Sequence, residues 1–391
     1  MHRYALALTL SLALMGCSKG QEARADNNAA DVSKPRITLV DGPPFASNGF
    51  GEFKEPWAMT FLPGGRLLVT ERAGALKLFS PANRTTIDVT GMPKVAYGGQ
   101  GGLGDVVLGP DADTTDSVYP IYLSWAEAGE DDVRGAAVGR GELVLDEAGK
   151  SAQVRNLKVI WRQVPKVSGN GHFSHRLAFS PDGQYLFISS GERQKFDPAQ
   201  DMSVNLGKIV RLLPDGAIPP DNPFADKGGV TAQIWSLGHR NILGLAFDAD
   251  GRLWEHEMGP KGGDEVNLIK EGLNYGYPIV SNGDHYDGKP IPDHDTHPEF
   301  EAPKVSWNPV ISPAGAIIYS GKLFPDWKGS MFIGGLSSEA LIRVALDGES
   351  ARKADQWDMG ARIREVEQGP DGAIWLLEDG KSGKLRKLTP P

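Results

Sequence analysis

The segment FSPDGQYLFISSGE, residues 179–192, contains the pattern that decides the fold of this chain. An apolar residue precedes a turn built from Pro, Asp and Gly, and a short run of β-forming residues follows it. Asp-Gly and Pro-Asp-Gly sequences favour tight turns between strands. The other copies are FLPGGRLLVTE from Phe61, a weaker VLGPDADTTDSVYPIYLSW from Val107, FDADGRLWEHE from Phe247, FPDWKGSMFIGG from Phe324 and GPDGAIWLLED from Gly369.

Six copies over about 355 residues give a period of roughly 60 residues, which indicates a repeat architecture. The stretches between the copies lack the 3.6-residue periodicity of a parallel α/β protein. Radially arranged four-stranded sheets satisfy this pattern and leave few exposed sheet edges. We therefore predict an all-β protein in which residues 36–391 form a single six-bladed β-propeller. A β-sandwich followed by a second domain is the alternative.

The composition agrees with this class and excludes several others. The chain has 391 residues, and 41 Lys and Arg against 50 Asp and Glu give a formal charge of −9. A broad nucleic-acid surface requires a basic stripe, so we expect no nucleic-acid partner. The 49 glycines and 28 prolines follow no collagen period and suit turns between strands.

Residues 1–16 have the pattern of an export signal, with a short basic start and an apolar stretch from Tyr4 to Met15. Cys17 is the only cysteine of the chain and directly follows this stretch, as at a bacterial lipoprotein processing site. We predict that residues 17–35 are a lipidated cysteine and a flexible polar tether. The protein is then held by lipid alone on the periplasmic face of a bacterial membrane, taken to be the outer one. A plain secretory signal with an incidental cysteine is the alternative.

Groups with ligand chemistry are concentrated between residues 236 and 278. Arg240 and Asn241 occupy a predicted turn, where the guanidinium suits a carboxylate or quinone oxygen and the amide both donates and accepts. The pair Gly259-Pro260 lies shortly before an Asp-Glu pair. Backbone carbonyls close to carboxylates provide the hard oxygen ligands that calcium selects.

Together, these motifs resemble the soluble quinoprotein glucose dehydrogenases and aldose sugar dehydrogenases, which use pyrroloquinoline quinone (PQQ). The similarity extends in patches from about Trp57 to the C-terminus. That family is a six-bladed propeller, so the resemblance implies the same fold as the repeat. It also implies a small sugar as substrate, PQQ and calcium as cofactors, and an electron acceptor whose identity is unknown.

Individual residues receive roles through this resemblance. The loop YGGQGGLGDVVLGPD from Tyr97 matches a cofactor-binding loop and makes Gln100 a cofactor contact. The segment GNGHFSHRLAFSPDG from Gly169 places the catalytic histidine at His172, with His175 as its nearest rival. The other cofactor-binding residues that the resemblance implies are Arg240, Asn241, Arg362 and Arg364.

The resemblance also implies two calcium sites. The carbonyls of Gly259 and Pro260 correspond to those that hold the calcium bridging to the quinone. Glu265 and the carbonyl of Tyr275 correspond to a second, structural calcium site.

The cationic part of the implied site agrees with the family in one place and departs from it in another. Arg362 and Arg364 are separated by one residue on a predicted strand, so both can face a ligand with three carboxylates. Ser337, in GGLSSEALIRV, occupies the place of the family's cofactor-binding lysine. Met258 and Gly171 also differ from the residues that glucose dehydrogenases have beside the Gly-Pro pair and the histidine.

Alcohol oxidation explains why such groups occur together. A base must take the hydroxyl proton while hydride leaves carbon, and histidine titrates near neutral pH. No side chain accepts a hydride, so a cofactor is required. We predict that the protein oxidises the anomeric hydroxyl of aldoses to lactones by hydride transfer to calcium-bound PQQ, with His172 as the base. The alternative is a non-catalytic propeller that binds a carbohydrate or a protein on its upper face, and Ser337 favours it.

A stretch rich in His and Asp, residues 283–300, could bind a transition metal through His285, His294 or His297. It lacks the ligand spacing of a zinc site, and its Gly, Pro and Asp content is that of a long loop. We predict a loop over the substrate mouth. His256 is expected in packing or on the surface.

Overall fold

The computed structural model describes residues 43–112, 117–146 and 149–391. Residues Pro43 to Pro391 form one compact unit. The predicted export signal, the lipidated Cys17 and its tether lie outside the described residues. Within the described part, no helix has the length and apolar character needed to cross a membrane.

The described residues form β-strands and short 3-10 turns without any α-helix, which confirms the all-β class. Four sheets have four strands each, and every neighbouring pair in them is antiparallel. In bonding order they are β1 (Ala46–Phe53), β27 (Gly383–Thr389), β26 (Ile374–Glu378), β25 (Ile363–Gln368); β11 (Ser174–Phe179), β12 (Leu186–Ser190), β13 (Lys208–Leu212), β14 (Ile234–Leu237); β15 (Ile242–Phe247), β16 (Leu253–Glu257), β18 (Asp264–Ile269), β20 (Val305–Trp307); and β21 (Pro313–Ile318), β22 (Met331–Gly335), β23 (Ala340–Asp347), β24 (Ser350–Asp358).

A larger sheet contains two more groups of four strands, joined by a parallel pairing of β5 with β9. Its members are β2 (Pro56–Phe61), β3 (Leu67–Glu71), β4 (Ala75–Ser80), β5 (Thr85–Thr90), β6 (Leu103–Leu108), β7 (Val118–Ala128), β8 (Val133–Leu145), β9 (Ala152–Arg162) and β10 (Val167–Ser168), which pairs with β8. The remaining elements are the ribbon β17 (Lys261–Gly262) with β19 (Gly283–Asp284), and the 3-10 turns η1 (Asp197–Ala199), η2 (Ala225–Lys227), η3 (Thr231–Gln233), η4 (His294–Thr296) and η5 (Pro325–Trp327).

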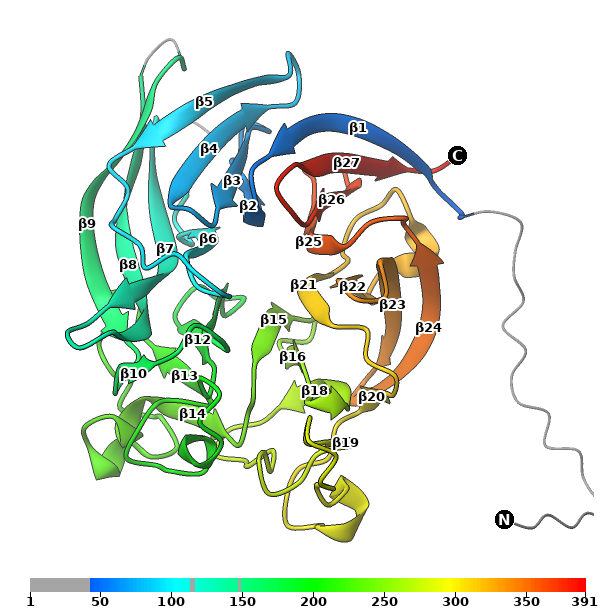
Figure 1. Cartoon of the computed structure of the whole chain (residues 1–391). Coiled ribbons are helices and arrows are strands. Elements are labelled where there is room, and N and C mark those ends of the chain that lie inside the picture. The colour runs from blue at the N-terminus through cyan, green and yellow to red at the C-terminus, as the bar shows by residue number, and fades with distance from the viewer. Residues whose placement is uncertain (1–42, 113–116, 147–148) are drawn as a thin grey trace, which may run out of the picture. The chain divides into compact units, whose positions relative to one another are not determined.

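One edge strand of each four-stranded group, called here the first strand, contacts the first strands of its two neighbouring groups, and together the six form a closed ring. The order around the ring is β2, β6, β11, β15, β21, β25 and back to β2, and Figure 1 shows the sheets arranged around it. Strand β1 completes the sheet of the last three strands, pairing with β27 from Ala46 opposite Thr389 to Phe53 opposite Gly383. The two ends of the compact unit are therefore fastened to each other by backbone hydrogen bonds.

The predicted turns have one common geometry. In four copies the N–H of the fourth turn residue donates to the carbonyl of the first, and the donating glycine has a positive φ that other residues rarely adopt. These pairs are Gly65 to Leu62 (2.8 Å), Gly183 to Ser180 (2.8 Å), Gly251 to Asp248 (3.0 Å) and Gly372 to Gly369 (2.8 Å). The strand after each turn, β3, β12, β16 or β26, is buried along its whole length.

The apolar core lies between neighbouring sheets. Trp254 on β16 and Val266 on β18, for example, pack in one cluster with Ile333 on β22 of the next sheet. Because the apolar side chains are used between sheets, the inner ends of the first strands can carry polar groups around the centre of the ring.

Candidate active site

One end of the first-strand ring encloses a cavity of about 210 Å³. The second residue of four first strands lines it. These residues are Trp57, His175, Leu243 and Arg364. The repeat thus brings side chains from four distant segments into one cavity.

The third residues of three first strands, Asp105, Arg176 and Glu365, form a buried ionic cluster that lines a different cavity, of about 440 Å³. Arg176 Nη1 lies 2.5 Å from Glu365 Oε2 and 3.5 Å from Asp105 Oδ1. Burial raises the pKa of Glu365 to about 7 and also raises that of Asp105, although Arg176 opposes both changes. As the structure describes it, none of the predicted site residues lines this second cavity.

The predicted catalytic base, His172, is buried in the loop before β11. Its backbone N–H donates to Gln100 Oε1 at 2.7 Å, and its Nδ1 is hydrogen-bonded to Glu192 Oε1. Burial lowers the pKa of His172, the charge of Arg240 lowers it further, and Glu192 opposes them. The imidazole is therefore neutral at neutral pH.

Glu192, which the sequence analysis did not identify, holds the ring of His172 from the loop after β12. Its other oxygen accepts the backbone N–H groups of Lys195 at 2.5 Å and Phe196 at 2.7 Å. Although burial favours the neutral form, the bonds from His172 and from the backbone keep the pKa of Glu192 below its ordinary value. An ionised carboxylate accepts only, so Nδ1 of His172 carries the proton and Nε2 is free to accept one.

Two neighbours of Glu192 fix the distance between its loop and the His172 loop. A Cβ on Gly191 would lie 2.0 Å from the carbonyl oxygen of His172, so only glycine permits this approach. The fully buried Arg193 donates to the carbonyls of Gly171 (2.8 Å), Arg134 (2.6 Å) and Gly169 (2.6 Å).

Arg240 and Asn241 lie between β14 and β15, as predicted for a turn. Their backbone N–H groups both donate to Glu257 Oε2, at 2.5 and 2.9 Å. Arg240 Nη1 donates to the carbonyl of Met258 at 2.9 Å, while its buried Nε has no hydrogen-bond partner among the described residues. A buried donor without a partner is available to a ligand.

Another cavity, of about 460 Å³, adjoins the 210 Å³ cavity and shares Gln100, Met258 and Ser312 with it. Every residue predicted for catalysis or cofactor binding lines one of these two cavities. The smaller is lined by Gln100, Asn241, Arg362 and Arg364, and the larger by Gln100, His172 and Arg240.

Arg362 and Arg364 both turn toward Asp379, which confirms that they lie on the same side of their segment. The Nε atoms of the two arginines lie 3.0 Å from its carboxylate oxygens. Arg362 also donates to the carbonyl of Leu336 at 3.3 Å. The carboxylate of Asp379 thus forms ion pairs with both guanidinium groups at the wall of the cavity.

The four predicted calcium ligands, Gly259, Pro260, Glu265 and Tyr275, line a third cavity of only about 10 Å³. This is the volume that a single water molecule or ion requires. Arg240, Glu257 and His294 are among the other residues of its wall, and His294 Nε2 lies 3.1 Å from the Tyr275 carbonyl oxygen. Gly259 and Pro260 also line the larger cavity beside Arg240, so they separate the two spaces.

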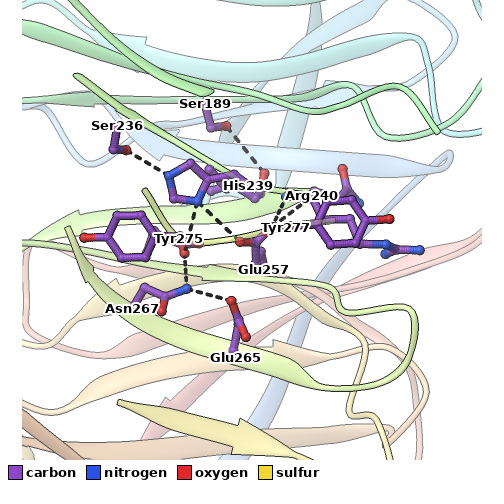
Figure 2. A network of polar contacts seen from close by, with 12 residues as sticks. Ser189, Ser236, His239, Arg240, Glu257, Glu265, Asn267, Tyr275 and Tyr277 are labelled. Atoms are coloured by element: carbon purple, nitrogen blue, oxygen red, sulfur yellow. Dashed lines mark hydrogen bonds and ion pairs between the residues drawn. The ribbon is translucent and has the colours of Figure 1, made fainter. Parts of the chain in front are cut away.

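Two buried acidic residues, Glu257 and Glu265, line this small cavity and belong to the polar network of Figure 2. Asn267 Nδ2 donates to Glu255 at 2.6 Å and to Glu265 at 3.0 Å, and His239 Nδ1 lies 3.3 Å from Glu257 Oε1. Burial and the charge of Glu257 raise the pKa values of Glu255 and Glu265. Within the described chain, Glu255 Oε2 and Asn267 Oδ1 are buried oxygens without hydrogen-bond partners.

Asp264, the first member of the Asp-Glu pair, fastens loops together. Its carboxylate accepts the backbone N–H groups of Gly259 (2.9 Å), Ile311 (2.8 Å) and Ser312 (2.7 Å). Burial raises its pKa to about 6, and these bonds oppose the change. Asp264 therefore orients the Gly259 peptide.

The remaining histidines separate into distinct environments. His175 is stacked on Trp57, and burial lowers its pKa to about 3. His256 is fully buried, so packing rather than surface is its environment. In the 283–300 segment, His285 lines a cavity of about 260 Å³ together with His172, whereas His297 pairs with Glu299 at 2.8 Å.

Ser337 is exposed, and its Oγ donates only a long bond, 3.4 Å, to the carbonyl of Val310. No positive charge takes the place of the family's lysine at this position.

The fold and the site define a class of protein that comparisons with known proteins identify. The chain is 39% identical over 341 residues to the aldose sugar dehydrogenase YliI of Escherichia coli, covering 86% of this chain and 90% of that protein. The crystal structure of the soluble aldose sugar dehydrogenase of Escherichia coli in the apo form superposes with a TM-score of 0.81 at 37% identity, covering 89% of this chain and all of that one. A PQQ-bound aldose sugar dehydrogenase from Streptomyces coelicolor superposes with a TM-score of 0.71 at 27% identity, over 89% and 99% of the two chains.

The class is thus that of sugar dehydrogenases, as the motifs predicted. Residues 53–387 match the glucose/sorbosone dehydrogenase family, and this chain belongs to that family.

Proposed function

We propose that this protein oxidises the anomeric hydroxyl of an aldose to a lactone, with PQQ as the hydride acceptor and calcium beside it. The observation that carries the proposal is the ring of His172, held by Glu192 with Nε2 free, in the wall of the larger of two adjoining cavities. Family membership and the PQQ-bound relative support the cofactor.

The residues present fit a quinone with three carboxylates. Arg362 and Arg364 line the smaller cavity, and no acidic side chain of the described segments lines it. Arg240 contributes a buried Nε without a partner among the described residues. Charge-assisted bonds from guanidinium groups are well suited to carboxylates.

The residues around the smallest cavity fit calcium. The cavity has the volume of one ion, and Glu257 and Glu265 line it together with residues whose backbone carbonyls are hard oxygen ligands. Among the described residues no Lys or Arg forms an ion pair with Glu255, Glu257 or Glu265, and a divalent ion would supply positive charge there. We propose Glu265 and the Tyr275 carbonyl as ligands of a structural calcium. The carbonyls of Gly259 and Pro260, on the side of the larger cavity, are proposed for a calcium at the quinone.

The chain's own residues supply the base chemistry. Nε2 of His172 accepts the proton of the C1 hydroxyl as the C1 hydride leaves, and a lactone results. Glu192 stabilises the imidazolium that forms and keeps the ring from rotating. When bound, the quinone supplies the hydride acceptor that no side chain can provide.

We further propose that the six four-stranded groups are six propeller blades, because their first strands form a closed ring. Attachment through a lipidated Cys17 to the periplasmic face of a bacterial membrane, the outer one, remains a proposal from the sequence. The electron acceptor is proposed to be external to this chain.

The second candidate function is a non-catalytic propeller that binds a carbohydrate or a protein, and the missing cation at Ser337 favours it. Reconstitution of the purified protein with PQQ and calcium, followed by aldose assays with a dye acceptor, tests both. Dye reduction that requires aldose, PQQ and calcium supports the dehydrogenase. Binding of a sugar without dye reduction supports the alternative.

A further inference from the structure

Arg72, directly after β3, is a charged residue of the site that neither the motifs nor the catalytic argument uses. Its side chain lines the smaller cavity together with Arg362 and Arg364. Burial lowers the pKa of Arg364, and the charges of Arg176 and Arg72 lower it further, while Asp379 opposes this. Arg72 and Arg364 are thus close enough to interact electrostatically.

The backbone of Arg72 is anchored in place. Its N–H donates to the carbonyl of Glu55 at 3.1 Å, and its own carbonyl accepts the N–H of Leu103 at 2.9 Å. A Cβ on Gly102 would lie 2.1 Å from that carbonyl oxygen, so glycine is needed for the two segments to approach. A fixed backbone limits the positions that the guanidinium can adopt.

The guanidinium of Arg72 has unused hydrogen-bonding capacity. Its Nη2 donates to the carbonyl of Gly99, and its centre lies 5.6 Å from the ring centroid of Tyr97. Its Nε is buried and has no partner among the described residues, and no carboxylate forms an ion pair with it there. A buried donor in this state is costly unless a ligand satisfies it.

The charge balance of the cavity also favours an anionic ligand. Three guanidinium groups, those of Arg72, Arg362 and Arg364, line it, and among the carboxylates that the structure describes only Asp379 pairs with any of them. At neutral pH this leaves an excess of two positive charges beside a mostly enclosed space. Such an excess favours an anionic ligand with more than one carboxylate.

We infer that Arg72 binds a carboxylate of the quinone and compensates for the cation missing at Ser337. The inference rests on the proposed function, because it assigns a further residue to the same cofactor. Arg72 is a binding residue in this account and takes no part in proton transfer.

The test is calorimetric titration of the calcium-loaded apoprotein with PQQ at low and high salt. Arg72→Gln should weaken PQQ binding by about 10–100-fold and reduce its salt dependence, because one charge is lost. Arg72→Lys, which retains the charge without the planar fork, should bind with intermediate affinity. Ser337→Lys in the Arg72→Gln background should restore most of the lost affinity.

Arg140→Gln is the matched control. Arg140 also lies over a tyrosine ring, 5.9 Å from the centroid of Tyr122, and it lines neither adjoining cavity. Equal PQQ affinity in the Arg140 and Arg72 variants, with unchanged melting temperatures, would overturn the inference about Arg72 alone. If Arg72→Gln does not fold, wild-type PQQ affinity in Arg72→Lys would overturn it. Failure of the wild-type protein to bind PQQ would contradict the proposed function and this inference together.

Discussion

Nδ1 of His172 is hydrogen-bonded to Oε1 of Glu192, 20 residues away along the chain, and both side chains are buried. The two residues lie on loops at the same end of the antiparallel β11–β12 pair, and Gly191 permits their close approach. The pairing places the proton on Nδ1 and leaves Nε2 free, so His172 can act as a base through Nε2.

Replacing Glu192 with Gln should lower turnover of an aldose by about 10²-fold while PQQ affinity is retained. The amide no longer stabilises the imidazolium and can hold the ring in either tautomer. Steady-state kinetics and PQQ titration of the same preparation measure the two effects. A turnover number within twofold of wild type would show that Glu192 only supports the loop.

His172→Ala should lower turnover by about 10²–10⁴-fold, the usual contribution of a positioned acid-base group. His175→Ala is the comparison, because His175 is stacked on Trp57 and hydrogen-bonded to Ser124. Loss of turnover only in the His175 variant would mean that the base had been assigned three residues too early.

The pH dependence follows from the environment of His172. Burial lowers its pKa, and the base acts in its neutral form, so activity should be lost only as the pH falls through a value below 6.5. Glu192 raises that pKa, so the acid limb of Glu192→Gln should move to still lower pH. A profile of kcat/KM against pH measures both, and an acid limb above 6.5 in the wild type would contradict this account.

Calcium should stabilise the folded protein through the small cavity at Glu265. An ion at 100 times its Kd adds about 2.7 kcal/mol to the free energy of unfolding. Removal by a chelator should therefore lower the melting temperature, and Glu265→Gln should reduce this response. Glu349→Gln, on an exposed side chain paired with Lys270, is the control. Identical melting curves with and without calcium would argue against the site.

Cys17→Ala should release the protein from the membrane fraction into the soluble periplasmic fraction, since the lipid is its proposed anchor. Cell fractionation followed by detection of the protein decides this. Unchanged membrane association of the variant would contradict lipidation at Cys17.

The turns could be predicted from the sequence because they depend on a local pattern, whereas the cavity residues were predicted from motifs that resemble those of a known family. Gly183 and its counterparts mark turns whose geometry requires glycine. His172 and Arg240 lie in short motifs that resemble those of the family. Glu192 was missed although it ends the quoted FSPDGQYLFISSGE segment, because its partner depends on how two loops meet. In other copies the glutamate ends the strand, as Glu257 ends β16, whereas Glu192 lies two residues after the end of β12.

The roles of buried polar residues were harder to predict for the same reason. Asp264 lies next to a proposed calcium ligand in the sequence, yet its carboxylate bonds three backbone N–H groups from two loops. Arg72 belongs to no recognised motif, and only the ring of first strands brings it beside Arg364. Such contacts are set by the closure of the whole ring.

The central claim is most directly tested by a single turnover of the protein reconstituted with PQQ and calcium. Mixing it with glucose in the absence of an acceptor should reduce the quinone, seen by its absorbance, and yield one equivalent of gluconolactone. The same experiment with His172→Ala should show bound quinone that is reduced at least about 10²-fold more slowly. Bound quinone that glucose does not reduce in the wild-type protein would contradict the assignment of this site to sugar oxidation.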